Sequence, residues 1–140
     1  MRPEYTQERD LTFNRWVRAN CPTPKEGWTA IDIDFVLRDY KHKRLALMEV
    51  KTHSASMTFA QEQTYRLLHN CITIGMSQIY PEWSFEGHWL LVFEGKGPQD
   101  GGIKLNGIDI TETQLLYYIS NIIDPRDRGL GAPKTITASL

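Results

Sequence analysis

Two apolar segments joined by a short polar turn place the strongest limit on how this chain can fold. In residues 29–38 isoleucines and a phenylalanine alternate with acidic residues, and residues 44–52 are mainly apolar. Such patterns predict two β-strands, the first with a period-two alternation and the second largely buried. Because only the polar residues 39–43 connect them, we expect the two strands to form an antiparallel hairpin.

Helical periodicity marks three other parts of the chain. Apolar residues recur at helical spacing in about residues 7–20, 59–70 and 111–123. Thr58, with Glu62 nearby, and Thr111 precede the second and third of these segments and are suitable N-caps. The sequence therefore predicts three helices.

The remaining segments predict further strands. Residues 71–86 look irregular, residues 88–93 resemble a buried strand, and residues 103–110 predict one or two short strands around an Asn-Gly turn. The expected order is α-β-β-α-β, followed by a short hairpin and a C-terminal helix. We therefore predict an α/β fold with a central mixed β-sheet flanked by helices.

The length of the chain fits one domain. Its 140 residues allow a single hydrophobic core. We expect that domain to span residues 1–123. Residues 124–140 contain several Gly and Pro residues and are predicted to form a surface arm or tail.

Composition limits the classes of protein that this chain can belong to. No apolar run is long enough for a membrane span, and the N-terminus lacks a secretory signal, so a cytoplasmic protein with no membrane partner is expected. The net charge of −1, from 16 basic and 17 acidic residues, counts mildly against a nucleic-acid binder. Cys21 and Cys71 are expected to be reduced thiols. Neither the cysteines nor the four histidines have zinc-ligand spacing, and the histidines are interpreted as structural or surface residues.

Charged residues inside the two predicted strands point to chemistry. Asp32 and Asp34 are two positions apart and would share a face of the first strand, as Glu49 and Lys51 would on the second. A hairpin would lay these faces side by side. Burying such charges is costly unless they pair or bind a cation. Since Mg²⁺ prefers carboxylate oxygens, the pattern predicts a Mg²⁺ site, at which Mn²⁺ is expected to substitute.

These residues resemble a known family. Asp34, followed by Glu49-Val50-Lys51, is similar to the motif of the PD-(D/E)xK nuclease superfamily, which has the restriction-endonuclease-like fold. Ile33 stands where the name of the motif has proline. The resemblance implies that Asp34 and Glu49 bind the metal, that the Val50 carbonyl is a further candidate ligand, and that Lys51 is the catalytic lysine. It favours Asp34 over Asp32 because apolar residues follow Asp34.

Other residues extend the resemblance, which covers about residues 7–93. Glu8 lies where several branches of the family place an additional metal-binding glutamate, and Asp32 is a further candidate ligand or supporting residue. Gln61 and Tyr65 are similar to the Gln-x-x-x-Tyr motif of the RecB-type branch, whose residues contact nucleic acid near the cut. Gln63 is the rival position in another register.

Basic residues at the predicted hairpin tip are candidates for phosphate contacts. Lys41, Lys43 and Arg44 belong to this run, which could equally be a solvated turn. We expect the chain to be a Mg²⁺-dependent DNA endonuclease, acting as a homodimer or with a protein partner, in phage genome processing, repair, recombination or restriction. The alternatives are a catalytically inactive nuclease-fold DNA-binding or assembly subunit, and an unrelated protein whose acids form a salt-bridge network with Lys51.

Overall fold

The fold is described for residues 11–127 of a computed structural model. The described chain divides into two compact units, one that ends at Ile31 and one that begins at Asp32. Each unit is described by itself below.

The first unit contains a short helix and a helical turn. Helix α1 spans Thr12–Asn20, and a 3₁₀ helix, η1, spans Pro24–Glu26. The rings of Phe13 and Trp16 stack with their centroids 5.9 Å apart. The helix ends where the Cys21 N–H donates to the Val17 carbonyl, as the following prolines predict. Residues 7–10 of the predicted helix lie outside the described residues.

The second unit is built on a mixed β-sheet. Within the described residues it has five strands in the order β1-β2-β3-β4-β5. The β2 and β3 strands are parallel, and the other neighbouring pairs are antiparallel. The strands are β1 (Phe35–Asp39), β2 (Arg44–Lys51), β3 (Ser84–Phe93), β4 (Ile103–Leu105) and β5 (Ile108–Ile110). The predicted α/β class with a mixed sheet is confirmed.

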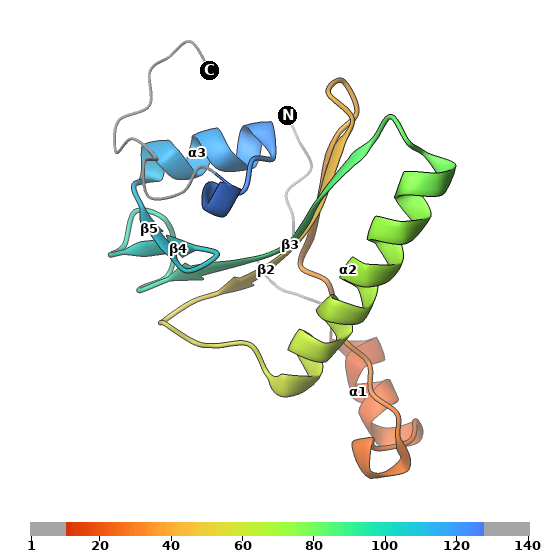
Figure 1. Cartoon of the computed structure of the whole chain (residues 1–140). Coiled ribbons are helices and arrows are strands. Elements are labelled where there is room, and N and C mark those ends of the chain that lie inside the picture. The colour runs from red at the N-terminus through yellow and green to blue at the C-terminus, as the bar shows by residue number, and fades with distance from the viewer. Residues whose placement is uncertain (1–10, 128–140) are drawn as a thin grey trace. The chain divides into compact units, whose positions relative to one another are not determined.

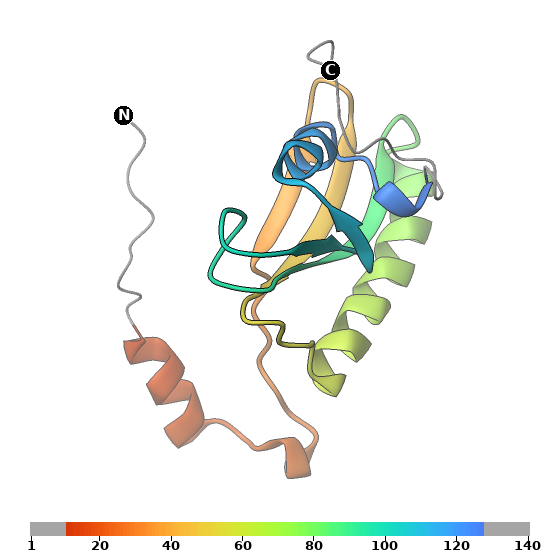
Figure 2. The ribbon, with the colours of Figure 1, turned by 90° about the vertical axis from the view of Figure 1, so that its left-hand side faces the viewer.

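Helices cover both faces of this sheet. Helix α2 (Phe59–Ile79) connects the parallel strands β2 and β3, and helix α3 (Glu112–Asn121) follows β5. The two helices lie on opposite sides of the sheet (Figures 1 and 2). Among the described residues, no helix combines the length and apolar character needed to cross a membrane.

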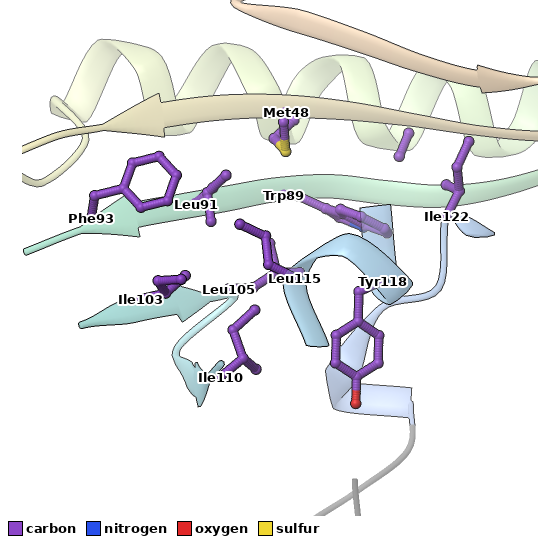
Figure 3. Packing of buried hydrophobic residues seen from close by; sticks show 11 residues of the cluster. Met48, Trp89, Leu91, Phe93, Ile103, Leu105, Ile110, Leu115, Tyr118 and Ile122 are labelled. Carbon is purple, nitrogen blue, oxygen red and sulfur yellow. The ribbon is translucent and has the colours of Figure 1, made fainter. Parts of the chain in front are cut away.

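The main hydrophobic core lies between the sheet and α3 (Figure 3). Alternate residues of β2 and β3 point into it because side chains of a strand alternate between its two faces. Trp89 is 1% exposed, and its indole N–H donates to the Glu86 carbonyl. The buried members of this core are Ala46, Met48, Trp89, Leu91, Phe93, Ile103, Leu105, Ile110, Leu115, Tyr118 and Ile122.

Several locally determined features agree with the sequence. The β1–β2 hairpin is antiparallel, and its backbone pairing runs from Phe35 opposite Met48 to Asp39 opposite Arg44. Asn106 and Gly107 both have positive φ, at 52° and 81°, as a two-residue hairpin turn between β4 and β5 requires. The predicted caps Thr58 and Thr111 both form capping boxes.

Two predicted boundaries are wrong. The strand expected over residues 29–38 begins only at Phe35, because the side chain of Asp34, rather than its backbone, accepts the next hydrogen bond from β2. The stretch of residues 71–86 that was expected to be irregular continues α2 as far as Ile79. Ile72 and Met76 are partly buried there, so tertiary packing outweighs the weak helix propensity of the β-branched residues.

A bulge in β3 sets which residues face α2. Leu45 pairs with Phe85 but Leu47 pairs with His88, so Glu86 and Gly87 together lie opposite Ala46. Gly87 has a φ of 97°, and a Cβ atom there would lie 3.2 Å from Cε1 of His69. The bulge therefore requires glycine, both for its backbone conformation and for space beside α2.

Replacing Gly87 by Ala is expected to lower the free energy of unfolding by about 1–2 kcal/mol, the usual cost of left-handed backbone for an L-residue. Gly75→Ala is the matched control, because Gly75 lies within α2 and a Cβ there would meet nothing within 4 Å. The control should gain about 0.5–1 kcal/mol, since Ala favours helix. Urea unfolding of both variants measures the two changes. Equal effects in the two variants would contradict this account of the bulge.

Candidate active site

The carboxylate of Asp34 takes the place of a backbone group at the end of the β1–β2 ladder. Phe35 pairs with Met48 in the antiparallel hairpin. Asp34, which precedes Phe35, therefore comes opposite Glu49, which follows Met48. Oδ2 of Asp34 accepts a hydrogen bond of 2.9 Å from the N–H of Val50. This contact holds the Asp34 side chain beside β2, where Glu49 and Lys51 lie.

Glu49 is the buried acid of this group. It is 3% exposed, and its Oε2 accepts a hydrogen bond of 2.6 Å from Nε2 of Gln61. Nζ of Lys51 lies 3.6 Å from the same oxygen. Oε1 is also buried and has no hydrogen-bond partner among the described residues. In the ionised form of Glu49, one oxygen is thus held by Gln61 and Lys51, and the other is buried without a donor among the described residues.

The environment of Glu49 disfavours its charged form. Burial is the largest cause, followed by a hydrogen bond shared with Asp34 and the negative charge of Asp34, and together they raise the pKa of Glu49 to about 7. Lys51 acts in the opposite direction but does not outweigh them. Two neighbouring carboxylates that resist simultaneous ionisation form a site that a cation would stabilise.

Gln61 links the start of α2 to the buried acid. It is the third residue of the helix, and its Oε1 accepts a hydrogen bond from the Thr58 N–H in the capping box. Its Nε2 donates to Glu49. The sequence suggested that Glu62 would support the cap and that Gln61 would contact nucleic acid. In the structure Gln61 completes the cap and orients Glu49, while Glu62 and Gln63 are exposed.

Gln61→Ala is expected to weaken both the fold and the site. Loss of the hydrogen bond from the Thr58 N–H to Gln61 Oε1 should lower the free energy of unfolding by about 0.5–1 kcal/mol, while the Thr58 hydroxyl still accepts from the backbone N–H of residue 61. Loss of the hydrogen bond to Glu49 should weaken Mn²⁺ binding roughly 10-fold, as for other residues that orient metal ligands. Thermal melts with increasing Mn²⁺ measure both effects. Gln63→Ala, a change on the exposed side of the same helical turn, should leave the free energy of unfolding and the Mn²⁺ affinity unchanged. Unchanged Mn²⁺ affinity in Gln61→Ala would remove its orienting role.

Tyr65 lies one helical turn after Gln61 and is 1% exposed. Burial, and then the charges of Glu49 and Asp34, raise the pKa of its hydroxyl to about 12. Its ring stacks on the His88 ring with their centroids 6.0 Å apart. Tyr65 is therefore buried beside the two acids. Its ring is not accessible to a nucleic acid in this conformation.

The other candidate metal ligands are Asp32, Glu8 and the Val50 carbonyl. Asp32 is exposed, and it lies before β1 rather than on a strand face shared with Asp34. Within residues 11–127, no three His, Cys, Asp or Glu residues form a potential metal-binding group. Glu8 lies outside the described residues. The Val50 side chain packs against the core on the opposite face of the sheet, which leaves only its backbone for the site.

The basic residues of the hairpin have different surroundings. Arg44 donates to the backbone carbonyl of Asn121 at 2.8 Å and so ties β2 to the end of α3. Lys41 and Lys43 are exposed, and their contact with phosphate remains a prediction. Asp39 organises the turn by accepting from the N–H groups of Lys41 and His42. Hydrogen bonds from His42 lower the pKa of Asp39.

The donor set fits a hard divalent cation. Mg²⁺ sites in proteins commonly use one or two carboxylates, with water and substrate phosphate filling the other positions. Asp34 and Glu49 supply two carboxylates, and the unpartnered Oε1 of Glu49 is a buried acceptor that a cation would satisfy. These residues could therefore hold Mg²⁺ or Mn²⁺ beside the Lys51 ammonium.

Comparison of the chain with family models, with curated proteins and with solved structures found no match.

Proposed function

We propose that this protein is a metal-dependent phosphodiesterase that hydrolyses DNA, with its active site at Asp34, Glu49 and Lys51. The observation that carries the proposal is the buried, partly unpartnered carboxylate of Glu49, which faces a second carboxylate and has an ammonium 3.6 Å away. Such an arrangement is unfavourable by itself and becomes favourable around a divalent cation.

The residues have distinct roles in this proposal. Asp34 and Glu49 hold the cation, which when bound lowers the pKa of a coordinated water and neutralises phosphate charge. Gln61 keeps Glu49 in its ligating orientation. Lys51, which is 19% exposed at its side chain, can donate to the attacking water or to the negatively charged phosphate oxygen. Buried Tyr65 excludes water from one side of the acids.

A salt-bridge network without catalysis is less well supported. A structural ion pair with Lys51 would lower the pKa of Glu49, because a nearby positive charge favours the carboxylate. The pKa of Glu49 is instead raised to about 7. Burial and Asp34 therefore outweigh Lys51, and a bound cation would relieve the repulsion between the two acids.

The second candidate function is a catalytically inactive DNA-binding or assembly subunit with the same fold. The net charge of −1 favours the assembly form of this subunit, bound to a protein partner, because phosphate contacts usually require a basic surface. The absence of a third acidic ligand within residues 11–127 also favours it.

A cleavage panel separates these functions. The purified full chain is incubated with supercoiled plasmid, linear duplex, single strand and four-way junction, each with Mg²⁺, with Mn²⁺ or with EDTA. Cutting that requires the metal and disappears in Asp34→Asn supports the nuclease and identifies its substrate class. DNA binding without cutting on any substrate would overturn the proposal in favour of the binding subunit.

A further inference from the structure

Two histidines converge on the α2 side of the sheet. Nδ1 of His69, from α2, lies 3.0 Å from Nδ1 of His88, from β3. The rings are nearly perpendicular, at 87°, with centroids 5.0 Å apart, so the two nitrogens approach without stacking of the rings. Both residues are partly buried rather than fully enclosed.

The surrounding chain holds this pair in place from several sides. The bulge at Glu86 and Gly87 turns His88 towards α2, and the missing Cβ of Gly87 leaves room for the His69 ring. The His69 ring packs edge-on against Phe85, with centroids 5.4 Å apart, and the His88 ring stacks on Tyr65. Because packing fixes both rings, the convergence of the two nitrogens is a property of the fold and not of two free surface side chains.

We propose that the Nδ1 atoms of His69 and His88 form a chelating site for a borderline transition-metal dication such as Zn²⁺ or Ni²⁺. Imidazole nitrogen is a preferred ligand of these ions. With metal–nitrogen bonds of about 2.0–2.1 Å, two ligands in neighbouring coordination positions lie about 2.9–3.4 Å apart. The separation of 3.0 Å falls within this range. No third His, Cys, Asp or Glu within residues 11–127 joins the pair, so water fills the other positions.

The lowered pKa of His88 suits metal binding. Burial is the largest cause that lowers the pKa of His88, and the nearby His69, Arg126 and Arg66 side chains lower it further. His88 is therefore neutral near pH 7, which is the form that binds metal. Without a cation, one Nδ1–H donates to the other Nδ1. Metal binding moves that proton to Nε2 of the same ring, so no proton need be lost.

Nearby positive charges do not prevent binding. Arg126 pairs with Asp124 through a contact of 2.6 Å between Nη2 and Oδ2, which offsets its charge. Arg66 is exposed, so water and salt screen it. Mg²⁺ should avoid this site because it prefers oxygen ligands. The selectivity of the His69–His88 pair is thus expected to be opposite to that of the carboxylate centre.

Calorimetric titration of the full chain with Zn²⁺ or Ni²⁺ alone tests the proposal. The titrations use Asp34→Asn protein, so that the carboxylate centre does not contribute. We expect binding of one ion per chain, and at least a 10-fold loss of affinity in His69→Gln and in His88→Gln. His42→Gln is the control, because His42 contacts Asp39 in the hairpin turn, and its affinity should stay within twofold. Equal affinity in all of these variants would overturn the proposal.

A spectroscopic measurement keeps the test decisive if a histidine variant fails to fold. Two-bond ¹H–¹⁵N correlation spectra separate Nδ1 from Nε2 in each of the four histidines. Saturating Zn²⁺ should shift the Nδ1 resonances of two histidines and convert both rings to the Nε2–H form. Unshifted Nδ1 resonances for those two rings would show that the contact is a hydrogen bond only, which also overturns the proposal.

Discussion

Replacing Glu49 by Gln is expected to abolish both metal binding at the carboxylate centre and DNA cleavage. The amide preserves the shape of the side chain and can still accept from Gln61, which holds Glu49 at 2.6 Å, but it removes the charge that attracts the cation. A cation present at 100 times its dissociation constant stabilises a protein by about 2.7 kcal/mol. The rise in melting temperature on addition of Mn²⁺ measures this stabilisation by the cation. That rise should vanish in Glu49→Gln.

In the metal-free protein, by contrast, Glu49→Gln should be more resistant than wild type to the loss of stability that occurs as the pH rises. The pKa of Glu49 is raised from 4.5 to about 7 in the folded state. Its contribution to stability is therefore fully present below pH 4.5 and is lost as the pH rises through about 7. That loss amounts to as much as about 3 kcal/mol, and Glu49→Gln should not show it.

Urea unfolding in EDTA at pH 5 and at pH 8 separates wild type from Glu49→Gln. Glu62→Gln, a change of an exposed acid on α2, is the control and should follow the wild-type pH dependence. Retained Mn²⁺ stabilisation in Glu49→Gln would place the metal elsewhere. A variant that loses as much stability between pH 5 and pH 8 as wild type would mean that Glu49 is ionised without cost.

Lys51→Ala is expected to lower the rate of cleavage by about 100-fold or more, the usual cost of losing a donor to transition-state charge. Metal binding should survive, because Lys51 is not a ligand and its ammonium opposes a cation beside Glu49, 3.6 Å away. Removing that positive charge should keep or strengthen Mn²⁺ affinity. Single-turnover cleavage and Mn²⁺ melts measure the two properties separately.

Lys43→Ala is the matched control for Lys51→Ala. It removes an exposed lysine from the turn before β2, whereas Lys51 ends the same strand beside the acids. The control should change cleavage by much less than Lys51→Ala, through weakened contact with DNA phosphates. Wild-type cleavage by Lys51→Ala, or a loss of metal binding in that variant, would exclude the role assigned to Lys51.

Local chemistry accounts for the features that the sequence predicted well. Thr58 and Thr111 cap their helices through hydrogen bonds with the third helical residue. Asn106 and Gly107 form a turn that their own backbone preferences favour. The β1–β2 hairpin follows from strand patterns on either side of a short connection. Each of these features depends on residues close together in the chain.

Longer-range contacts explain the errors at element boundaries. The sequence could not show that α2 runs to Ile79, because partial burial of Ile72 and Met76 overrides their local signal. It placed Asp34 inside a strand, whereas the structure uses its carboxylate to end the ladder. In both cases a contact with another element decided between local conformations of similar energy.

The sequence by itself determined that two acids and a lysine lie on a hairpin of an α/β fold, because strand alternation and a short turn allow few other arrangements. Only the tertiary structure decided that Gln61 orients Glu49, 12 residues away, and that His69 meets His88, 19 residues away. These contacts depend on how α2 packs on β3, including the bulge at Gly87. The periodicity of residues within one helix or strand shows which face is buried. It does not show which residues of another element that face contacts, so these contacts could not be predicted from the sequence.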